Sequence, residues 1–363
     1  MIAVTVPFTR LRPGEDAADV DTAIRRVLDR GWFVLGPEVE AFEDEFARAV
    51  GTACAVGVGT GTDAIALILR ALGIGAGDEV ITTPLSAAYT ALAVMMAGAR
   101  PVFADLDESR FTLDPAAVEA AISARTRAIL PVHLYGQPAN LPALARIAAQ
   151  HHLALVEDCC QAHLATCGGR PVGTFGVAGA YSFYPTKNLG ALGDAGAVVT
   201  GDRGLADRLK RLRNGGQTDR YRHAEAGVNS RLDELQAAVL RARLPWLATW
   251  TARRRTLAAR YRDALASADV SLPTECDAGH VYHLFVIRSK QRDRLQSHLA
   301  DCGVEALIHY PIPIPRQPAV ASTRPADCPI ADRVCRELLS LPLHPAMGDE
   351  EADAVARAVC VFA

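Results

Sequence analysis

The stretch Leu153-Ala154-Leu155-Val156-Glu157-Asp158 is a short apolar run that ends in two carboxylates. It is the last of four such runs, which are separated by alanine-rich segments with helical patterning. The other runs lie at 79–82, 101–105 and 128–132, and the helical segments at 90–99, 114–122 and 141–151. Apolar strands that alternate with helices predict a mostly parallel sheet covered by helices on both faces. Ligands of such sheets bind at the carboxyl ends of the strands, where Asp158 lies.

The pattern changes after residue 200. Helical patterning predicts helices over 205–213, 230–244, 251–266 and 291–302, with a break at Pro245. An apolar run predicts a strand over 282–287, and a proline-rich segment predicts a loop over 308–315. The last segment has too many prolines for a central strand. We therefore predict an α/β protein with a large domain over residues 1–245 and a smaller C-terminal α/β domain over 246–363.

Composition limits the class of protein. The chain has 363 residues, half of them hydrophobic, with 38 basic against 41 acidic side chains. Such a balance gives no electrostatic bias toward nucleic acid or an anionic membrane. No apolar stretch reaches the roughly 20 residues that span a bilayer. The segment from Met1 to Pro7 lacks the features of a signal peptide, so we expect a cytoplasmic protein.

The nine cysteines are scattered and odd in number, and no two of them form a C-x-x-C pair. This spacing fits neither a zinc site nor a disulfide framework. We interpret them mostly as small buried hydrophobic residues and expect no metal.

A lysine and a serine stand close together in the run Tyr181-Ser182-Phe183-Tyr184-Pro185-Thr186-Lys187-Asn188-Leu189-Gly190. A single lysine is usually a solvated surface charge. Aromatic residues, a proline and a following glycine-rich stretch instead suggest a partly buried Lys187. Desolvation lowers the pKa of a lysine, as covalent chemistry with an aldehyde requires. Ser182 offers a hydroxyl to a phosphate on the same short segment.

A loop of small residues, Gly59-Thr60-Gly61-Thr62, precedes an evident helix start at Asp63. Backbone amides and hydroxyls at the positive end of a helix suit a phosphate group. The same residues also suit a plain strand-to-helix turn, and they form neither a dinucleotide fingerprint nor a Walker pattern.

Asp158 is the third candidate group. It could simply cap a helix, but Gln161 follows at the spacing from which an amide reaches a neighbouring ring substituent. A carboxylate beside a ring nitrogen favours the protonated pyridinium. A lysine, a carboxylate at the end of a strand and a phosphate loop are together the parts that hold pyridoxal phosphate.

The ordered motifs resemble the DegT/DnrJ/EryC1/StrS family of pyridoxal-phosphate enzymes, which act mainly on nucleotide-linked keto-sugars. The resemblance spans nearly the whole chain. Besides the segments already quoted, it rests on motifs at residues 31–43, 227–231, 236–238, 309–311 and 339–342.

The resemblance implies the aspartate-aminotransferase-like fold (fold type I) and a homodimer with active sites at the subunit interface. It makes Lys187 the lysine that bonds to the cofactor, Asp158 the partner of the pyridine nitrogen and Gln161 the neighbour of the ring hydroxyl. Thr60, Gly61, Thr62 and Ser182 would hold the phosphate, helped by Asn229 of the neighbouring subunit. From the residues alone, Asn229 or Ser230 is only a helix cap.

The substrate side departs from the family pattern at two places. Relatives often place an aromatic side chain over the cofactor ring. When the segment is aligned without gaps, Ala87 stands at that position, and Tyr89 is the nearest aromatic residue that could take its place. Pro315 stands where relatives commonly have histidine. We assign Tyr89, Arg220, His309 and Tyr310 to the substrate side. Arg220 is equally well explained by a solvated polar loop.

The resemblance implies ping-pong amino transfer from glutamate or glutamine, most closely to C3 of a dTDP-3-keto-6-deoxyhexose. Amination at C4 is the alternative within the family. The presence of Lys187 argues against the dehydratase members, in which histidine replaces it, and Lys187 with Asp158 argues against a non-catalytic regulator of the same fold. A Rossmann-type oxidoreductase would need a glycine-rich fingerprint after a first strand, and we find none.

Overall fold

The computed structural model describes residues 5–12, 14–320 and 327–362, and all statements below concern these residues. The helices are α1 (Ala17–Arg30), α2 (Pro37–Val50), α3 (Gly61–Ala71), α4 (Tyr89–Met96), α5 (Pro115–Ala121), α6 (Leu141–Gln150), α7 (Arg203–Leu212), α8 (Glu234–Arg243), α9 (Leu247–Ala264), α10 (Arg292–Asp301), α11 (Pro329–Glu337) and α12 (Asp349–Cys360). The strands of the main sheet are β1 (Cys54–Val58), β2 (Glu79–Thr82), β3 (Arg100–Phe103), β6 (Thr126–Leu130), β7 (Ala154–Asp158), β10 (Ala178–Ser182) and β11 (Gly196–Thr200). The short pairs are β4 (Leu106–Asp107) with β5 (Thr112–Leu113), β8 (Thr166–Cys167) with β9 (Arg170–Pro171), β12 (Gln217–Asp219) with β13 (Arg222–His223), and β14 (Phe285–Arg288) with β15 (Leu338–Leu341).

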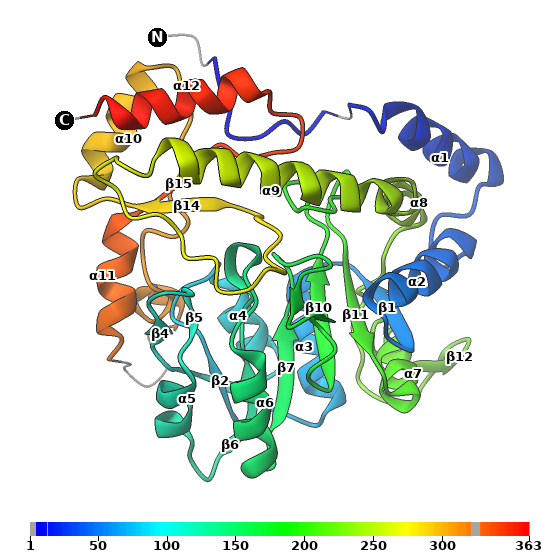
Figure 1. The fold of residues 1–363 in the computed structure, drawn as a ribbon. Helices are drawn as coiled ribbons and strands as arrows, with labels where there is room; N and C mark the ends of the chain where they lie inside the picture. Colours follow the sequence, from blue (N-terminus) through cyan, green and yellow to red (C-terminus); the bar gives the residue numbers. More distant parts are fainter. Residues whose placement is uncertain (1–4, 13, 321–326, 363) are drawn as a thin grey trace.

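The main sheet has seven strands in the order β1-β11-β10-β7-β6-β2-β3 (Figure 1). Only β11 runs against its neighbours, so the sheet is mostly parallel, as predicted. The four predicted apolar runs form β2, β3, β6 and β7, each within two residues of the expected bounds. Every residue of β2 is buried, as expected for a strand covered on both faces.

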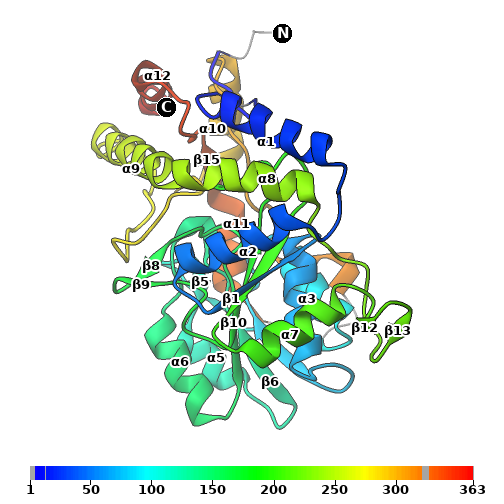
Figure 2. The same ribbon diagram turned by 90° about the vertical axis from the view of Figure 1, so that its right-hand side faces the viewer.

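Helices cover both faces of this sheet (Figure 2). On one face α3, α4 and α7 pack their apolar side chains against alternate strand residues, including Val56 and Val58. On the other face α2 and α8 pack over β1, β10 and β11, and α5 and α6 pack over β2, β6 and β7. The carboxyl ends of the parallel strands are thus left for a ligand.

Most of the C-terminal elements form a cluster of their own at the end of the sheet where the parallel strands finish (Figure 1). Helix α11 instead shares a core with residues of the large part, including Leu85 and Phe103. The antiparallel pair β14–β15 packs with α9, α10 and α12, and Val6 from the N-terminal segment joins this core. The predicted boundary at 245/246 falls within the 3-10 turn Leu244–Trp246, which joins α8 to α9. The outer limits at residues 1 and 363 lie outside the described residues.

The strand predicted over 282–287 begins later, at Phe285. Tyr282 has a left-handed φ of 46°, and the amide of Leu284 donates to the carbonyl of Tyr135. Residues 282–284 contact the large part of the molecule instead of pairing with β15, so the strand begins three residues later than predicted.

Two predicted helix starts also differ. The helix expected from residue 230 begins at Glu234, because Asn229 pairs with Asn214 and the amide of Ser230 donates to Arg213. The helix expected from residue 251 begins at Leu247, because Pro245 occupies a 3-10 turn in which its missing amide is not needed.

None of the helices within the described residues combines the length and apolar character needed to cross a membrane. All nine cysteines lie within the described residues and are free thiols, four of them buried.

Candidate active site

Lys187 lies in the loop between β10 and β11, at the carboxyl end of the sheet. Its amide donates to the carbonyl of Tyr184 in a tight turn, and its side chain is half-buried, as predicted. Burial lowers the pKa of Lys187, and the nearby Cys160 and Asp158 oppose that shift.

Asp158 is the last residue of β7 and is buried. Its Oδ1 accepts from the amide of Cys160 at 3.1 Å, and its Oδ2 accepts from the hydroxyl of Thr90, at the start of α4, at 2.9 Å. A buried carboxylate with two donors is held in one orientation. Sequence reasoning missed Thr90, because a threonine at a helix start gives no signal of such a contact.

Gln161 connects the backbone of Tyr135 to the proposed substrate side. Its Oε1 accepts from the amide of Tyr135 at 2.8 Å, which leaves Nε2 facing the hydroxyl of Tyr310 at 3.2 Å. The hydroxyl of Tyr135 donates to the carbonyl of His309. Burial raises the pKa of Tyr310 to about 12, so this phenol stays protonated. The structure thus brings Gln161, His309 and Tyr310 together.

The phosphate-type loop caps α3. Thr60 accepts the amide of Asp63 through its hydroxyl, and the amides of Gly61 and Thr62 have no acceptor within the described residues. A Cβ on Gly61 would lie 2.7 Å from both Cys160 Sγ and Ser182 Cβ. Glycine therefore allows the helix start to approach β10, which places free amides beside Ser182.

His163 is a buried neighbour that the sequence did not reveal. Its Nε2 donates to the carbonyl of Ser182 at 2.8 Å, and its Nδ1 has no partner within the described part of the chain. Burial, followed by the charge of Lys187, lowers the pKa of His163 to about 3, so the imidazole is neutral.

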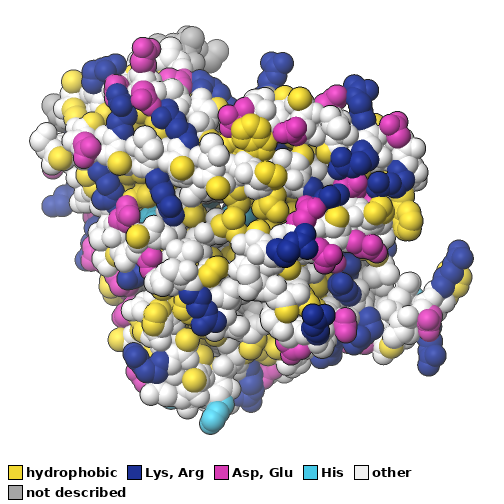
Figure 3. All heavy atoms as spheres, turned by 45° about the vertical axis from the view of Figure 1, so that its right-hand side comes forward, with side chains coloured by type: hydrophobic (Ala, Val, Ile, Leu, Met, Phe, Trp, Pro, Cys, Tyr) yellow, Lys and Arg dark blue, Asp and Glu magenta, His cyan; other side chains and the backbone are white. Residues whose placement is uncertain are grey.

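Three of the proposed residues are not brought to Lys187 in this chain. Tyr89 is 65 % exposed at the start of α4, and Asn229 is exposed after the β12–β13 hairpin. Arg220 lies at the tip of that hairpin, with its guanidinium 5.2 Å from the ring of Tyr221, which is 80 % exposed. Figure 3 shows the hairpin standing clear of the body with basic side chains at its end.

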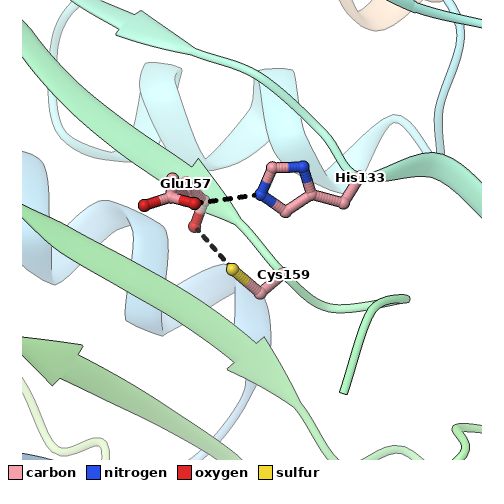
Figure 4. Close-up of side chains that lie close together, drawn as sticks. All are labelled: His133, Glu157 and Cys159. Carbon is pink, nitrogen blue, oxygen red and sulfur yellow. Dashed lines mark hydrogen bonds and ion pairs between the residues drawn. The ribbon is translucent and has the colours of Figure 1, made fainter. Parts of the chain in front are cut away.

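A second buried cluster, His133, Glu157 and Cys159, has spacing that could suit a metal (Figure 4). Its ligand atoms are already engaged. Glu157 accepts the amides of Gly173, Phe175 and Gly176 at 2.7–2.9 Å. His133 Nδ1 accepts the amide of Ala139, so Nε2 carries the proton and donates to Glu157 at 3.2 Å. The cluster anchors loops behind β7.

Sequence comparison places this geometry in a known group. The pattern that defines the DegT/DnrJ/EryC1/StrS aminotransferase family matches residues 15–360. The chain belongs to this family. The expected family, the fold type I architecture and the activity of a transaminase are thereby confirmed.

Several relatives match almost end to end. The dTDP-3-amino-3,4,6-trideoxy-alpha-D-glucose transaminase of Streptomyces venezuelae is 49 % identical, over 98 % of this chain and 95 % of the relative. The erythromycin biosynthesis sensory transduction protein EryC1 of Saccharopolyspora erythraea is 51 % identical, over 96 % and 97 %. The crystal structure of S. venezuelae DesV with a ketimine intermediate has a TM-score of 0.95 and 50 % identity, over 98 % and 97 % of the two chains.

Proposed function

We propose that this aminotransferase uses pyridoxal phosphate to move an amino group from glutamate or glutamine to a nucleotide-linked keto-sugar. The proposed acceptor position is C3 of a dTDP-3-keto-6-deoxyhexose. The observation that carries the proposal is the half-buried Lys187 together with the buried Asp158 at the carboxyl end of the sheet. A relative of 49 % identity named for a dTDP-3-amino sugar supports the acceptor.

The described residues fit the cofactor at three points. The buried carboxylate of Asp158 suits a pyridinium nitrogen, and the amine of Lys187 suits an aldehyde. The unpartnered amides of Gly61 and Thr62, beside Ser182, suit a phosphate. When bound, pyridoxal phosphate supplies an electrophilic carbonyl for the amino group and an electron sink for the substrate carbon.

Each side chain then has a defined task. Lys187, whose pKa burial lowers, accepts and returns the proton at the substrate carbon. Asp158, oriented by Thr90, would hold the proton on the ring nitrogen of the bound cofactor. Gln161 and Tyr310 offer an N–H and an O–H beside the ring. Tyr89 and His309 belong to the proposed substrate side.

We further propose a homodimer in which Asn229 and Arg220 serve the site of the neighbouring subunit. In one chain both are exposed, and the hairpin that carries Arg220 projects from the body. The apolar side chains of Trp32, Phe33 and Val34 are exposed in the single chain, which supports a surface that the second subunit covers. Arg220 would pair with the diphosphate of the nucleotide.

Amination at C4 of the sugar is the second candidate within the family. A single experiment separates the positions. The protein is loaded with pyridoxal phosphate, incubated with glutamate and then with dTDP-, UDP- and GDP-linked 3-keto- and 4-keto-sugars, and the products are identified by mass and NMR. We expect the visible absorbance band to shift with glutamate and a 3-amino dTDP-sugar to form. A 4-amino product, or reaction only with a UDP- or GDP-sugar, would replace this acceptor with another one.

A further inference from the structure

A small basic pocket opens beside Lys187, away from the loop proposed for the phosphate. It lies between residues 9–12 and 14–16 of the N-terminal segment, the Lys187 loop, α9 and residues 344–346, and we call it the Arg254 pocket. Its lining includes Arg10, Arg12, Lys187, Trp250, Arg254 and His344. Its volume is about 220 Å³, below the roughly 300 Å³ at which pockets for drug-sized ligands begin. It suits part of a small metabolite.

The two acidic side chains that line this pocket are already engaged. Asp16 accepts from Arg243 at 2.7 Å, and Glu15 accepts from the indole of Trp250 at 2.6 Å. Arg10 is paired with Glu351, outside the pocket lining. Arg12 is exposed and has no ion pair within the described residues. The indole is neutral, so Glu15 keeps its negative charge. Arg12, Lys187 and Arg254 have no ion pair within the described residues and outnumber it, so the pocket lining has a net positive charge.

Arg254 is the central unpaired cation. Its side chain comes from α9, the residue is only 6 % exposed, and no carboxylate lies within ion-pair distance of it in the described part of the chain. Nη1 donates to the carbonyls of Tyr282, His283 and Leu343, while Nε has no partner. Burial, with no opposing carboxylate, lowers the pKa of Arg254 to about 10. Because a buried cation is rarely left without a counter-charge, the pocket favours an anion.

His344 adds a second unsatisfied group. It is 2 % exposed, and although the carbonyl of Pro7 is nearby, neither ring nitrogen makes a hydrogen bond of normal geometry to the described residues. Burial, followed by the charges of Arg10 and Arg254, lowers its pKa to about 4. A neutral imidazole carries one N–H that an anion can accept.

We propose that the Arg254 pocket binds a carboxylate of the amino-acid donor, with Arg254, His344 and Arg12 as its contacts. This inference rests on the proposed function and names the site that admits its donor. Because Lys187 lines the same pocket, a carboxylate held there keeps the donor beside the amine.

The test uses the holoenzyme and glutarate, a dicarboxylate that lacks the reactive amine. Binding is measured by calorimetry and by the fluorescence of Trp250, which lines the pocket. We expect Arg254→Gln to weaken glutarate binding at least tenfold and Arg12→Gln about three- to tenfold, as for lost charge-assisted hydrogen bonds. Arg253→Gln is the matched control, because the neighbouring Arg253 pairs with Asp349 and does not line the pocket. Its glutarate affinity should equal that of the wild type.

Arg254 also holds three carbonyls, so Arg254→Gln could fail to fold. In that case Arg12→Gln and His344→Leu decide the question by the same measurement. Unchanged glutarate affinity in the folded variants would overturn the proposal. The proposal would also be overturned if these variants react with glutamate as the wild type does but bind pyrophosphate more weakly. That result would assign the pocket to the diphosphate. The glutamate-dependent absorbance change of the wild type reports on the proposed function separately from these affinities.

Discussion

The hydroxyl of Thr90 donates a 2.9 Å hydrogen bond to Oδ2 of Asp158, across the 68 residues that separate them in the chain. Both residues are buried, Thr90 at the start of α4 and Asp158 at the end of β7. The contact orients the carboxylate that we propose for the ring nitrogen. Thr90 is therefore a positioning residue.

Removing this hydroxyl should weaken cofactor binding. A hydrogen bond to a charged group contributes about 1.5–3 kcal/mol, so Thr90→Val should raise the Kd for pyridoxal phosphate about ten- to hundredfold. Thr90→Ser should restore most of the affinity. Thr82→Val is the control, because Thr82 is equally buried and donates to the carbonyl of Leu130 instead. Equal losses in Thr90→Val and Thr82→Val would assign the effect to packing alone.

Gly61 allows the phosphate-type loop to approach β10. In Gly61→Ala the new Cβ would lie 2.7 Å from Ser182 Cβ and Cys160 Sγ, so α3 must move. We expect a loss of at least tenfold in cofactor affinity, measured by titration of the apo protein, and a lower melting temperature. Gly201→Ala, where no atom lies within 4 Å of the new Cβ, should change neither. Normal cofactor affinity in Gly61→Ala would remove this loop from the phosphate site.

Lys187→Ala should abolish the visible absorbance band of the holoenzyme and its turnover, because in the proposed function this amine bonds to the cofactor and carries the proton. Lys290→Ala, at an exposed position, serves as the control and should retain both. Turnover near the wild-type rate in Lys187→Ala would exclude Lys187 from catalysis.

Two histidines with lowered pKa values, the buried His163 and the half-buried His309, should make the fold sensitive to acid. Burial, followed by the charge of Lys187, lowers the pKa of His163 to about 3 and of His309 to about 4. In the unfolded chain these histidines have a pKa near 6.5, so below about pH 6.5 the unfolded chain binds more protons than the folded one. The free energy of unfolding therefore falls as the pH falls, by up to about 1.4 kcal/mol per pH unit for each histidine.

Urea unfolding between pH 7 and pH 4 measures this slope. His309→Gln should make it shallower, whereas His151→Gln, at the exposed end of α6, should leave it as it is. An unchanged slope in His309→Gln would mean that His309 binds its proton equally well in the folded state.

The proposed sharing of active sites predicts complementation between inactive subunits. Lys187→Ala and Asn229→Ala should each have little activity. If the two are unfolded and refolded together, half of the dimers are mixed and each holds one intact site, so about a quarter of the wild-type activity should return. Refolding each variant alone is the control. No recovery in a mixture shown by light scattering to be dimeric would place Asn229 outside the partner's site.

The sequence predicted the parts of the fold that have strong periodic signals. The four apolar runs and the helices that alternate with them form as expected, because burial on both faces demands continuous apolar strands. The strands β1, β10 and β11 were missed. Each of them contains glycine and alanine, and small residues give a weak strand signal. At Gly196 in β11 a Cβ would meet the backbone of Thr60 and Gly61, so glycine is needed there for the start of α3 to approach the sheet.

The candidate site was predictable to a similar degree. The positions of Lys187, Asp158, Gln161 and Ser182 followed from motifs, and the structure gathers them at one end of the sheet. Thr90, His163 and Arg254 did not, because each acts through a contact with residues distant in the chain. The roles of Asn229 and Arg220 depend on a second subunit, which one sequence does not position.

The antiparallel strand β11 has a consequence for the order of folding. β1 pairs only with β11, with Cys54 opposite Thr200, so its edge of the sheet has no neighbour until the chain beyond Lys187 has been made. The loop after β1, which we propose for the phosphate, cannot take its final place earlier. During synthesis Lys187 therefore leaves the ribosome before the loop proposed for the phosphate has reached its final place. The site forms late, through contacts between residues that are far apart in the sequence.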